Sequence, residues 1–179
     1  QDGVITTHNF SVENDPWVVD HAIDGTPVLP GVIGLELMTA TAALLAPNEP
    51  LVGAADVSFL KPVKAHKGGN VALTMSAVPT KTPGAFTASL SSSRTLRTGR
   101  VQTTEHFTAT ILFGEQHTTQ PLPSLLMPDE KITANEIYAR FFHGPKFQVL
   151  TGTSSVAADG LLTGAATQDD AIASPFVST

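Results

Sequence analysis

The strongest constraint on the fold is one long apolar segment, residues 32–45, which follows Pro30-Gly31 and ends before Ala46-Pro47-Asn48. Apolar side chains occur nearly all the way round a helix built from this segment: Val32, Ile33, Leu35, Leu37, Met38, Ala42, Leu44 and Leu45. This pattern is typical of a buried helix rather than of an amphipathic surface helix. The segment is also too short and too interrupted to cross a bilayer. We therefore expect one helix packed inside a globular core.

The remaining pattern up to residue 113 is of the β type. Residues 3–10 predict an edge strand, and further strands are expected over 51–63, 71–78, 85–91 and 99–113. The last of these alternates apolar and polar side chains, which indicates one buried face. We expect loops or turns over 14–17, 21–27, 81–84 and 91–98. A long buried helix followed by an antiparallel meander is typical of an α+β hotdog fold, in which a sheet wraps round the helix.

The second part of the chain is much shorter. Residues 118–131 are rich in proline and polar residues and predict a linker between a first hotdog at 1–117 and a second unit at 132–179. Thr133 and Glu136 have the spacing of a capping box, which predicts a short helix. Residues 149–157 resemble a strand. Because residues 132–179 are too few to close a second sheet round a second long helix, we expect an incomplete second hotdog.

Composition excludes several function classes. The formal net charge is −6 and there is no basic run, which argues against nucleic-acid binding. The absence of cysteine excludes disulfides, thiolate metal sites and a cysteine nucleophile. The other histidines lack ligand-like spacing, so no metal site is expected. No signal peptide or membrane span is recognised, and a cytoplasmic location is expected. Three lysines, at positions 61, 64 and 67, could meet an acidic partner protein or a phosphate group, but they are few and spread out and are interpreted as ordinary surface charges.

The motif that carries chemistry is His21-x3-Gly25-x4-Pro30, directly before the predicted helix. The histidine offers an imidazole base, the glycine permits close backbone approach, and the proline fixes where the helix begins. The first N–H groups of the helix, around Gly31, have no acceptor within the helix and can donate to a carbonyl oxygen. A base beside carbonyl-polarising donors is what proton abstraction next to a thioester requires.

These residues resemble a known family. Asp15-Pro16-Trp17, Asp20-His21, Gly25 and Val28-Leu29-Pro30-Gly31, with Leu35-Glu36 on the helix, are similar to the first signature of dehydratase domains of polyketide synthases and polyunsaturated fatty-acid synthases. His143-Gly144-Pro145-Lys146-Phe147-Gln148 resembles the Tyr-Gly-Pro-x-Phe segment that opens the second hotdog of that family. The two motifs are separated by about the length of one hotdog, and together they are more specific than either alone.

The resemblance implies a double hotdog that dehydrates a β-hydroxyacyl thioester on an acyl carrier protein. On this hypothesis His21 is the catalytic base. The substrate-binding residues would be Gly25, Pro30, Gly31, His143, Gly144 and Pro145. The resemblance implies no cofactor and no metal, since the substrate arrives on the phosphopantetheine of the carrier protein. The implied partners are that carrier protein and neighbouring domains of a megasynthase, with a homodimer as a further possibility.

Two departures from the family pattern leave alternatives open. The family's acid is an aspartate on the second long helix, and we assign this role to none of Asp159, Asp169 or Asp170. His143 replaces the family's tyrosine and is compatible with a supporting role or a structural one. The alternative function is a non-catalytic hotdog module that binds acyl chains or scaffolds a megasynthase. A hotdog thioesterase ranks last because it would need a carboxylate base near the helix.

Overall fold

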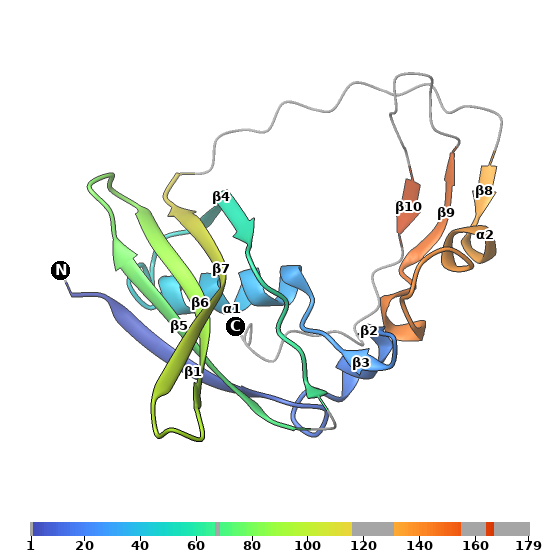
Figure 1. Cartoon of the computed structure of the whole chain (residues 1–179). Coiled ribbons are helices and arrows are strands. Elements are labelled where there is room, and N and C mark those ends of the chain that lie inside the picture. Colours follow the sequence, from blue (N-terminus) through green and yellow to red (C-terminus); the bar gives the residue numbers. More distant parts are fainter. Residues whose placement is uncertain (1, 67–68, 116–130, 155–163, 167–179) are drawn as a thin grey trace.

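The computed structural model describes residues 2–66, 69–115, 131–154 and 164–166 (Figure 1). The first part of the chain contains one long helix and a set of long strands. Its elements are β1 (Val4–Phe10), η1 (Pro16–Asp20), β2 (Ala22–Ile23), β3 (Thr26–Pro27), α1 (Gly31–Ala43), β4 (Leu51–Phe59), β5 (Val71–Pro79), β6 (Ala85–Thr95) and β7 (Val101–Phe113). The second part contains β8 (Lys131–Thr133), α2 (Ala134–Tyr138), η3 (Pro145–Phe147), β9 (Leu150–Ser154) and β10 (Gly164–Ala166).

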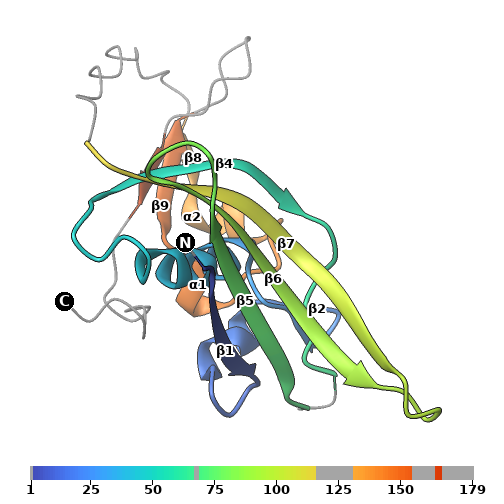
Figure 2. The same cartoon turned by 90° about the vertical axis from the view of Figure 1, so that its left-hand side faces the viewer.

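The main layer is a five-stranded antiparallel sheet in the order β1-β5-β6-β7-β4. Strand β1 lies at one edge, as predicted, and β4 lies at the other. Helix α1 packs against β1, β5, β6 and β7, and the curved sheet passes over it in the side view (Figure 2). The α+β hotdog architecture predicted from the sequence is therefore confirmed for this part of the chain.

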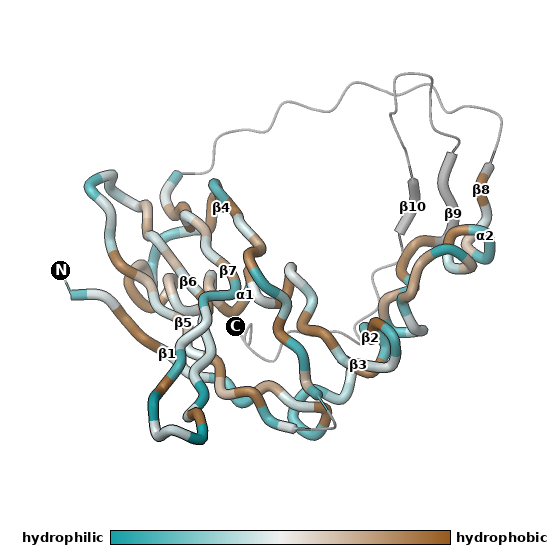
Figure 3. The backbone as a smooth tube through the Cα atoms, in the orientation of Figure 1, coloured by the Kyte–Doolittle hydropathy of each residue, from teal (hydrophilic) through white to brown (hydrophobic). Residues whose placement is uncertain are grey.

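Alternation along the strands builds the core between sheet and helix, and apolar and polar stretches alternate along the backbone tube (Figure 3). The inward face of β7 consists of Phe107, Ala109, Ile111 and Phe113, and it meets Leu37, Met38 and Ala42 of α1 in one buried cluster. Gly34 of α1 lies directly under Phe107, where a Cβ atom would overlap the aromatic ring. The absence of that Cβ lets helix and sheet approach closely.

Three local predictions need correction. The helix predicted over 32–45 is not buried all the way round: Val32 is 69% exposed, and Leu44, which follows the end of α1 at Ala43, is 59% exposed. The strand expected over 51–63 ends at Phe59. Residues 21–27 form the β2–β3 hairpin rather than an irregular loop.

The polar loop expected over 91–98 is largely strand. Strand β6 continues to Thr95, because its backbone pairs with β7 and its polar side chains find cross-strand partners. The Ser93 and Thr103 hydroxyls lie 3.0 Å apart, and the Arg94 guanidinium donates to the Gln102 side-chain carbonyl at 2.8 and 3.0 Å. Cross-strand pairs of this kind stabilise a sheet without any apolar alternation.

The second part forms a small three-stranded sheet in the order β10-β9-β8, next to the short helix α2. The predicted capping box is confirmed: the Glu136 N–H donates to the Thr133 hydroxyl, and the Thr133 N–H donates to the Glu136 carboxylate at 2.8 Å. This backbone hydrogen bond, with that of the Thr133 hydroxyl, lowers the pKa of the Glu136 carboxyl. The predicted linker lies outside the described residues except for Lys131, which begins β8. Most of 155–179, including the three unassigned aspartates, also lies outside them.

Candidate active site

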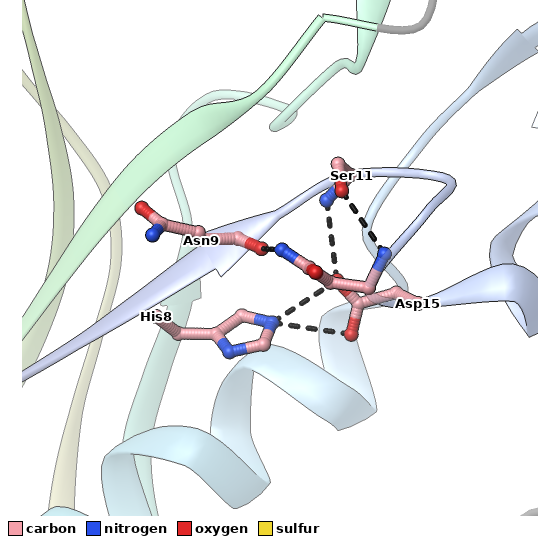
Figure 4. A network of polar contacts seen from close by, with 5 residues as sticks. His8, Asn9, Ser11 and Asp15 are labelled. Carbon is pink, nitrogen blue, oxygen red and sulfur yellow. Dashed lines mark hydrogen bonds and ion pairs between the residues drawn. The ribbon is translucent and has the colours of Figure 1, made fainter.

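A buried polar network holds the turn that leads into the site (Figure 4). The Asp15 side chain is 4% exposed and accepts hydrogen bonds from His8 Nε2, at 3.0 and 3.1 Å, and from the Ser11 N–H, at 3.2 Å. Asn14 closes the same turn by donating from its side-chain amide to the Asn9 carbonyl at 2.7 Å. The 3₁₀ helix η1 begins immediately after Asp15, so this network fixes where η1 starts and hence where His21 emerges.

The β2–β3 hairpin sets the chemical form of His21. Its two turn residues, Asp24 and Gly25, have φ values of 49° and 72°, the paired left-handed conformations of a type I′ turn. This turn brings Val28 opposite His21: the Val28 N–H donates to the His21 carbonyl at 3.0 Å. His21 Nδ1 in turn lies 2.8 Å from the Val28 carbonyl oxygen. Because a carbonyl only accepts, Nδ1 must carry the proton, and in the neutral ring Nε2 is left with a free lone pair.

Aromatic rings from the second part of the chain surround this imidazole. The centroid of the His21 ring lies 4.9 Å from Phe142, 5.3 Å from Phe147 and 5.4 Å from His143. His143 stacks on Phe142 at 4.4 Å, and Phe147 makes an edge contact with Trp17 at 6.2 Å. The motif beginning at His143 therefore completes the surroundings of His21, although the two are far apart in sequence.

Asp20 is the residue that docks the second motif beside His21. Its backbone carbonyl accepts from the Gly144 N–H at 2.7 Å, and its carboxylate accepts from the Lys146 N–H at 3.2 Å. A Cβ atom on Gly144 would overlap the Asp20 carboxylate and would lie 2.8 Å from its Cγ and 2.9 Å from its Cα. Glycine is therefore required at 144 by close packing against Asp20.

A cavity of about 560 Å³ opens beside His21. It is mostly apolar. Its lining comes from His21 just after η1, from the segment between β3 and α1, from the start of α1, from the end of β4 and the residues after it, from β7 and from the second motif: His21, Val28, Leu29, Pro30, Gly31, Val32, Phe59, Lys61, Pro62, Phe107, His143 and Phe147. The first backbone bond of α1 runs from the Gly34 N–H to the Pro30 carbonyl at 3.1 Å, and no side chain caps the helix. The earlier N–H groups, at Gly31 and Val32, are thus donors at the wall of the cavity.

The site has an imidazole pair and, among the described lining residues, no carboxylate. Partial burial, and secondarily the electrostatic repulsion that a protonated His143 would meet from a protonated His21, lower the pKa of His143. His143 is therefore neutral at physiological pH. The arrangement can accept a proton at His21 Nε2 and polarise a carbonyl at the start of α1, but the described lining residues include no carboxyl group that could protonate a leaving hydroxyl.

Comparisons with known proteins identify the family to which the chain belongs. The sequence profile of the family described as "Polyketide synthase dehydratase domain" matches residues 1–93. The chain belongs to this family. The polyketide synthase ThaG of Burkholderia thailandensis is 44% identical to it over 66 residues, which are 34% of this chain and 1% of ThaG. The resemblance inferred from the two motifs is confirmed.

Solved dehydratase domains share the fold. The dehydratase domain of a mycocerosic acid synthase-like polyketide synthase has a TM-score of 0.74 at 17% identity, covering 96% of this chain and 60% of that domain. The dehydratase domain from the CurF module of the curacin polyketide synthase also has a TM-score of 0.74, at 15% identity, over 87% of this chain and 58% of that domain. The chain thus spans no more than about 60% of the solved domains it matches.

The structure brings together some of the predicted site residues of this dehydratase-family chain and separates others. His21, Pro30, Gly31 and His143 line one cavity. Three others lie outside its lining: Gly25 forms the exposed turn of the hairpin, Gly144 packs on Asp20, and Pro145 begins η3. For these three residues, substrate binding stays a prediction.

Sequence reasoning missed several residues of the site. Phe59, Lys61, Phe107 and Phe147 line the cavity, and Asp20 docks the second motif. Strand alternation marked Phe107 as buried but not as a cavity residue. Asp20 and Phe147 belong to the two family motifs, but the sequence assigned neither of them a role in the site. The docking role of Asp20 could not be seen locally, because its partner Lys146 lies 126 positions away. Among the described residues there is no cluster of three or more metal-ligating side chains, and no helix that is long and apolar enough to cross a membrane.

Proposed function

We propose that this chain supplies the base half of a dehydratase active site, which removes water from a β-hydroxyacyl thioester held on an acyl carrier protein. The observation that carries the proposal is the hydrogen bond from His21 Nδ1 to the Val28 carbonyl, at 2.8 Å. It leaves Nε2 as an unprotonated base on the wall of an apolar cavity.

In the proposed reaction His21 Nε2 takes the α-proton of the acyl group. The electron pair of the broken C–H bond forms the new double bond, and the β-hydroxyl leaves with a proton as water. The N–H groups of Gly31 and Val32 stabilise the thioester oxygen while negative charge develops on it. We propose that the leaving hydroxyl takes its proton from a carboxylic acid that is not among the described residues of the cavity lining. A related solved structure supports the base: an inactive mutant of the CurJ dehydratase has a histidine replaced by phenylalanine.

The partners follow from the family. Dehydratases of this kind are parts of polyketide synthases, so we propose that the substrate arrives on a carrier protein and that neighbouring synthase domains flank this one. The reaction needs no cofactor of its own, since it moves only protons and water. A cytoplasmic location fits such a synthase. Homodimer formation remains a prediction.

One observation favours the alternative, a non-catalytic module that binds acyl chains. No carboxylate lines the cavity among the described residues, whereas an elimination needs an acid for the leaving hydroxyl. The dehydratase hypothesis predicts turnover of the thioester and the module hypothesis predicts none, whereas both predict that the acyl group binds.

The test is to incubate the complete dehydratase domain that contains this chain with a β-hydroxyacyl thioester and to follow enoyl absorbance and the loss of one water by mass. We expect turnover in the wild type and none in His21→Ala. His66→Ala is the matched control, because His66 is exposed and lies outside the cavity lining. Wild-type protein that binds the thioester without forming enoyl product would favour the acyl-binding module. Full activity in His21→Ala would exclude His21 as the base.

A further inference from the structure

The cavity wall carries one ammonium group. Lys61 follows the end of β4, and it is the only cationic lysine or arginine among the described residues that line the cavity. Within the described part of the chain it has no ion-pair partner, and no carboxylate lines the cavity beside it. The protein as a whole has a formal net charge of −6. A lysine at a cavity wall without a neighbouring carboxylate in the lining attracts anionic groups of a ligand.

The backbone of Lys61 is held by a buried histidine. The Leu60 N–H donates to the His106 carbonyl at 2.8 Å, and the Lys61 N–H donates to the same oxygen at 3.3 Å. In return His106 Nδ1 donates to the Lys61 carbonyl at 3.1 Å. His106 is 6% exposed, and its Nε2 accepts from the Ser92 hydroxyl at 2.8 Å. Both nitrogens of the ring are thus engaged, and the ring fixes the chain segment that carries Lys61.

A β-bulge places His106 in this position. Leu90 pairs with Phe107 and the next residue, Ser91, pairs with Glu105, so that His106 is the extra residue on β7. In a bulge of this kind the extra residue is left out of the regular strand pairing, and its side chain points in a new direction. Here the redirected imidazole ties β7 to the segment after β4, next to the cavity. A histidine that only filled space in the strand would not need directed hydrogen bonds at both ring nitrogens, one with Lys61 and one with Ser92.

We propose that the Lys61 ammonium binds the phosphate of the phosphopantetheine arm that delivers the thioester to His21, and that His106 positions this lysine. The inference rests on the proposed function, since it assumes a carrier-bound substrate. An ammonium is a compact partner for a phosphate, and the apolar cavity beyond it suits the uncharged remainder of the arm. The lysine that the sequence placed among ordinary surface charges is thereby distinguished from Lys64, which is outside the cavity lining.

The test compares two probes that differ only in the phosphate, phosphopantetheine and pantetheine. Their dissociation constants are measured by NMR titration of the isotope-labelled complete domain. We expect the wild type to bind phosphopantetheine about five- to tenfold more tightly, the worth of one hydrogen bond to a charged group at an exposed site. This preference should weaken at high salt. It should vanish in Lys61→Gln, persist in Lys61→Arg and be unchanged in the matched control Lys64→Gln.

The positioning role of His106 is tested with the same quantity, the ratio of the dissociation constants for pantetheine and phosphopantetheine. His106→Asn retains a side-chain N–H for the Lys61 carbonyl and should keep the phosphate preference, whereas His106→Phe should lose it. A merely structural effect would weaken both probes equally and leave the ratio intact. If His106→Phe does not fold, the Lys61 variants still decide the proposal.

Three results would overturn the inference: no phosphate preference in the wild type, an unchanged preference in Lys61→Gln, or an equal loss in Lys64→Gln. Inorganic phosphate that displaces phosphopantetheine at equal concentration would indicate a site for free phosphate instead. The binding test does not depend on turnover, so the two proposals can fail independently. If the dehydratase proposal alone is wrong, the domain will form no enoyl product and will still bind phosphopantetheine more tightly than pantetheine.

Discussion

Gly144→Ala tests whether the second motif must dock on Asp20 to complete the site. The added Cβ would overlap the Asp20 carboxylate and lie 2.9 Å from its Cα, which is backbone and cannot rotate away. Overpacking of this kind costs about 1–3 kcal/mol. If the motif moves away instead, it loses two hydrogen bonds to Asp20, worth about 1 kcal/mol each. Either response weakens docking by about 2 kcal/mol, or roughly thirtyfold in the docking equilibrium.

The only tryptophan reports on this docking, since Trp17 contacts Phe147 of the same motif. We expect Gly144→Ala to shift tryptophan emission to the red and to reduce dehydration by the complete domain, while far-UV circular dichroism stays unchanged. Lys146→Ala is the matched control, because it changes an exposed side chain of the motif and keeps the backbone N–H that donates to Asp20. Unchanged emission and activity in Gly144→Ala would refute the reasoning that close packing at Asp20 holds the motif in place.

Three further predictions concern stability. The lowered pKa of His143 means that the unfolded chain binds a proton at this residue more readily than the folded chain does. The stability that neutral His143 contributes is therefore complete above pH 6.5 and is lost as the pH falls below it. Between about pH 8 and pH 5 the melting temperature of His143→Gln should fall less than that of the wild type. Gly34→Ala should lower the free energy of unfolding in urea by about 1–3 kcal/mol, because the new Cβ would overlap the Phe107 ring. A second change, Phe107→Leu, should recover part of this loss. If the losses of the two single variants simply added, the overlap of Cβ and ring would be contradicted. Asp15→Ala should cost about 1–3 kcal/mol, because it leaves the buried Ser11 N–H unpaired and removes one hydrogen-bond partner of His8. Asp15→Asn should cost less, and equal unfolding midpoints for the two variants would argue against this reasoning.

Local patterns predicted the framework well. The buried helix and the strands follow from periodicity, and the His21-to-Gly31 motif follows from residue types at short spacing, so all of these could be read from neighbouring positions. The errors arose where structure depends on distant partners. The strand character of β6 up to Thr95 comes from polar pairs with β7, and β2 and β3 have two residues each, too few for any period to show. The packing of Phe142 and Phe147 on His21 joins segments that no local window contains.

The type I′ turn at Asp24-Gly25 makes loop length a determinant of reactivity. Val28 faces His21 because the hairpin between them turns over two residues, Asp24 and Gly25. The Val28 carbonyl therefore determines which ring nitrogen of His21 holds the proton. An insertion of one residue at this turn would bring a different backbone group opposite His21 and release Nδ1. The imidazole could then carry its proton on either nitrogen, and part of the population would present an N–H where the reaction needs a lone pair. A change in the turn, outside the cavity lining, would thus alter the base itself through its tautomer.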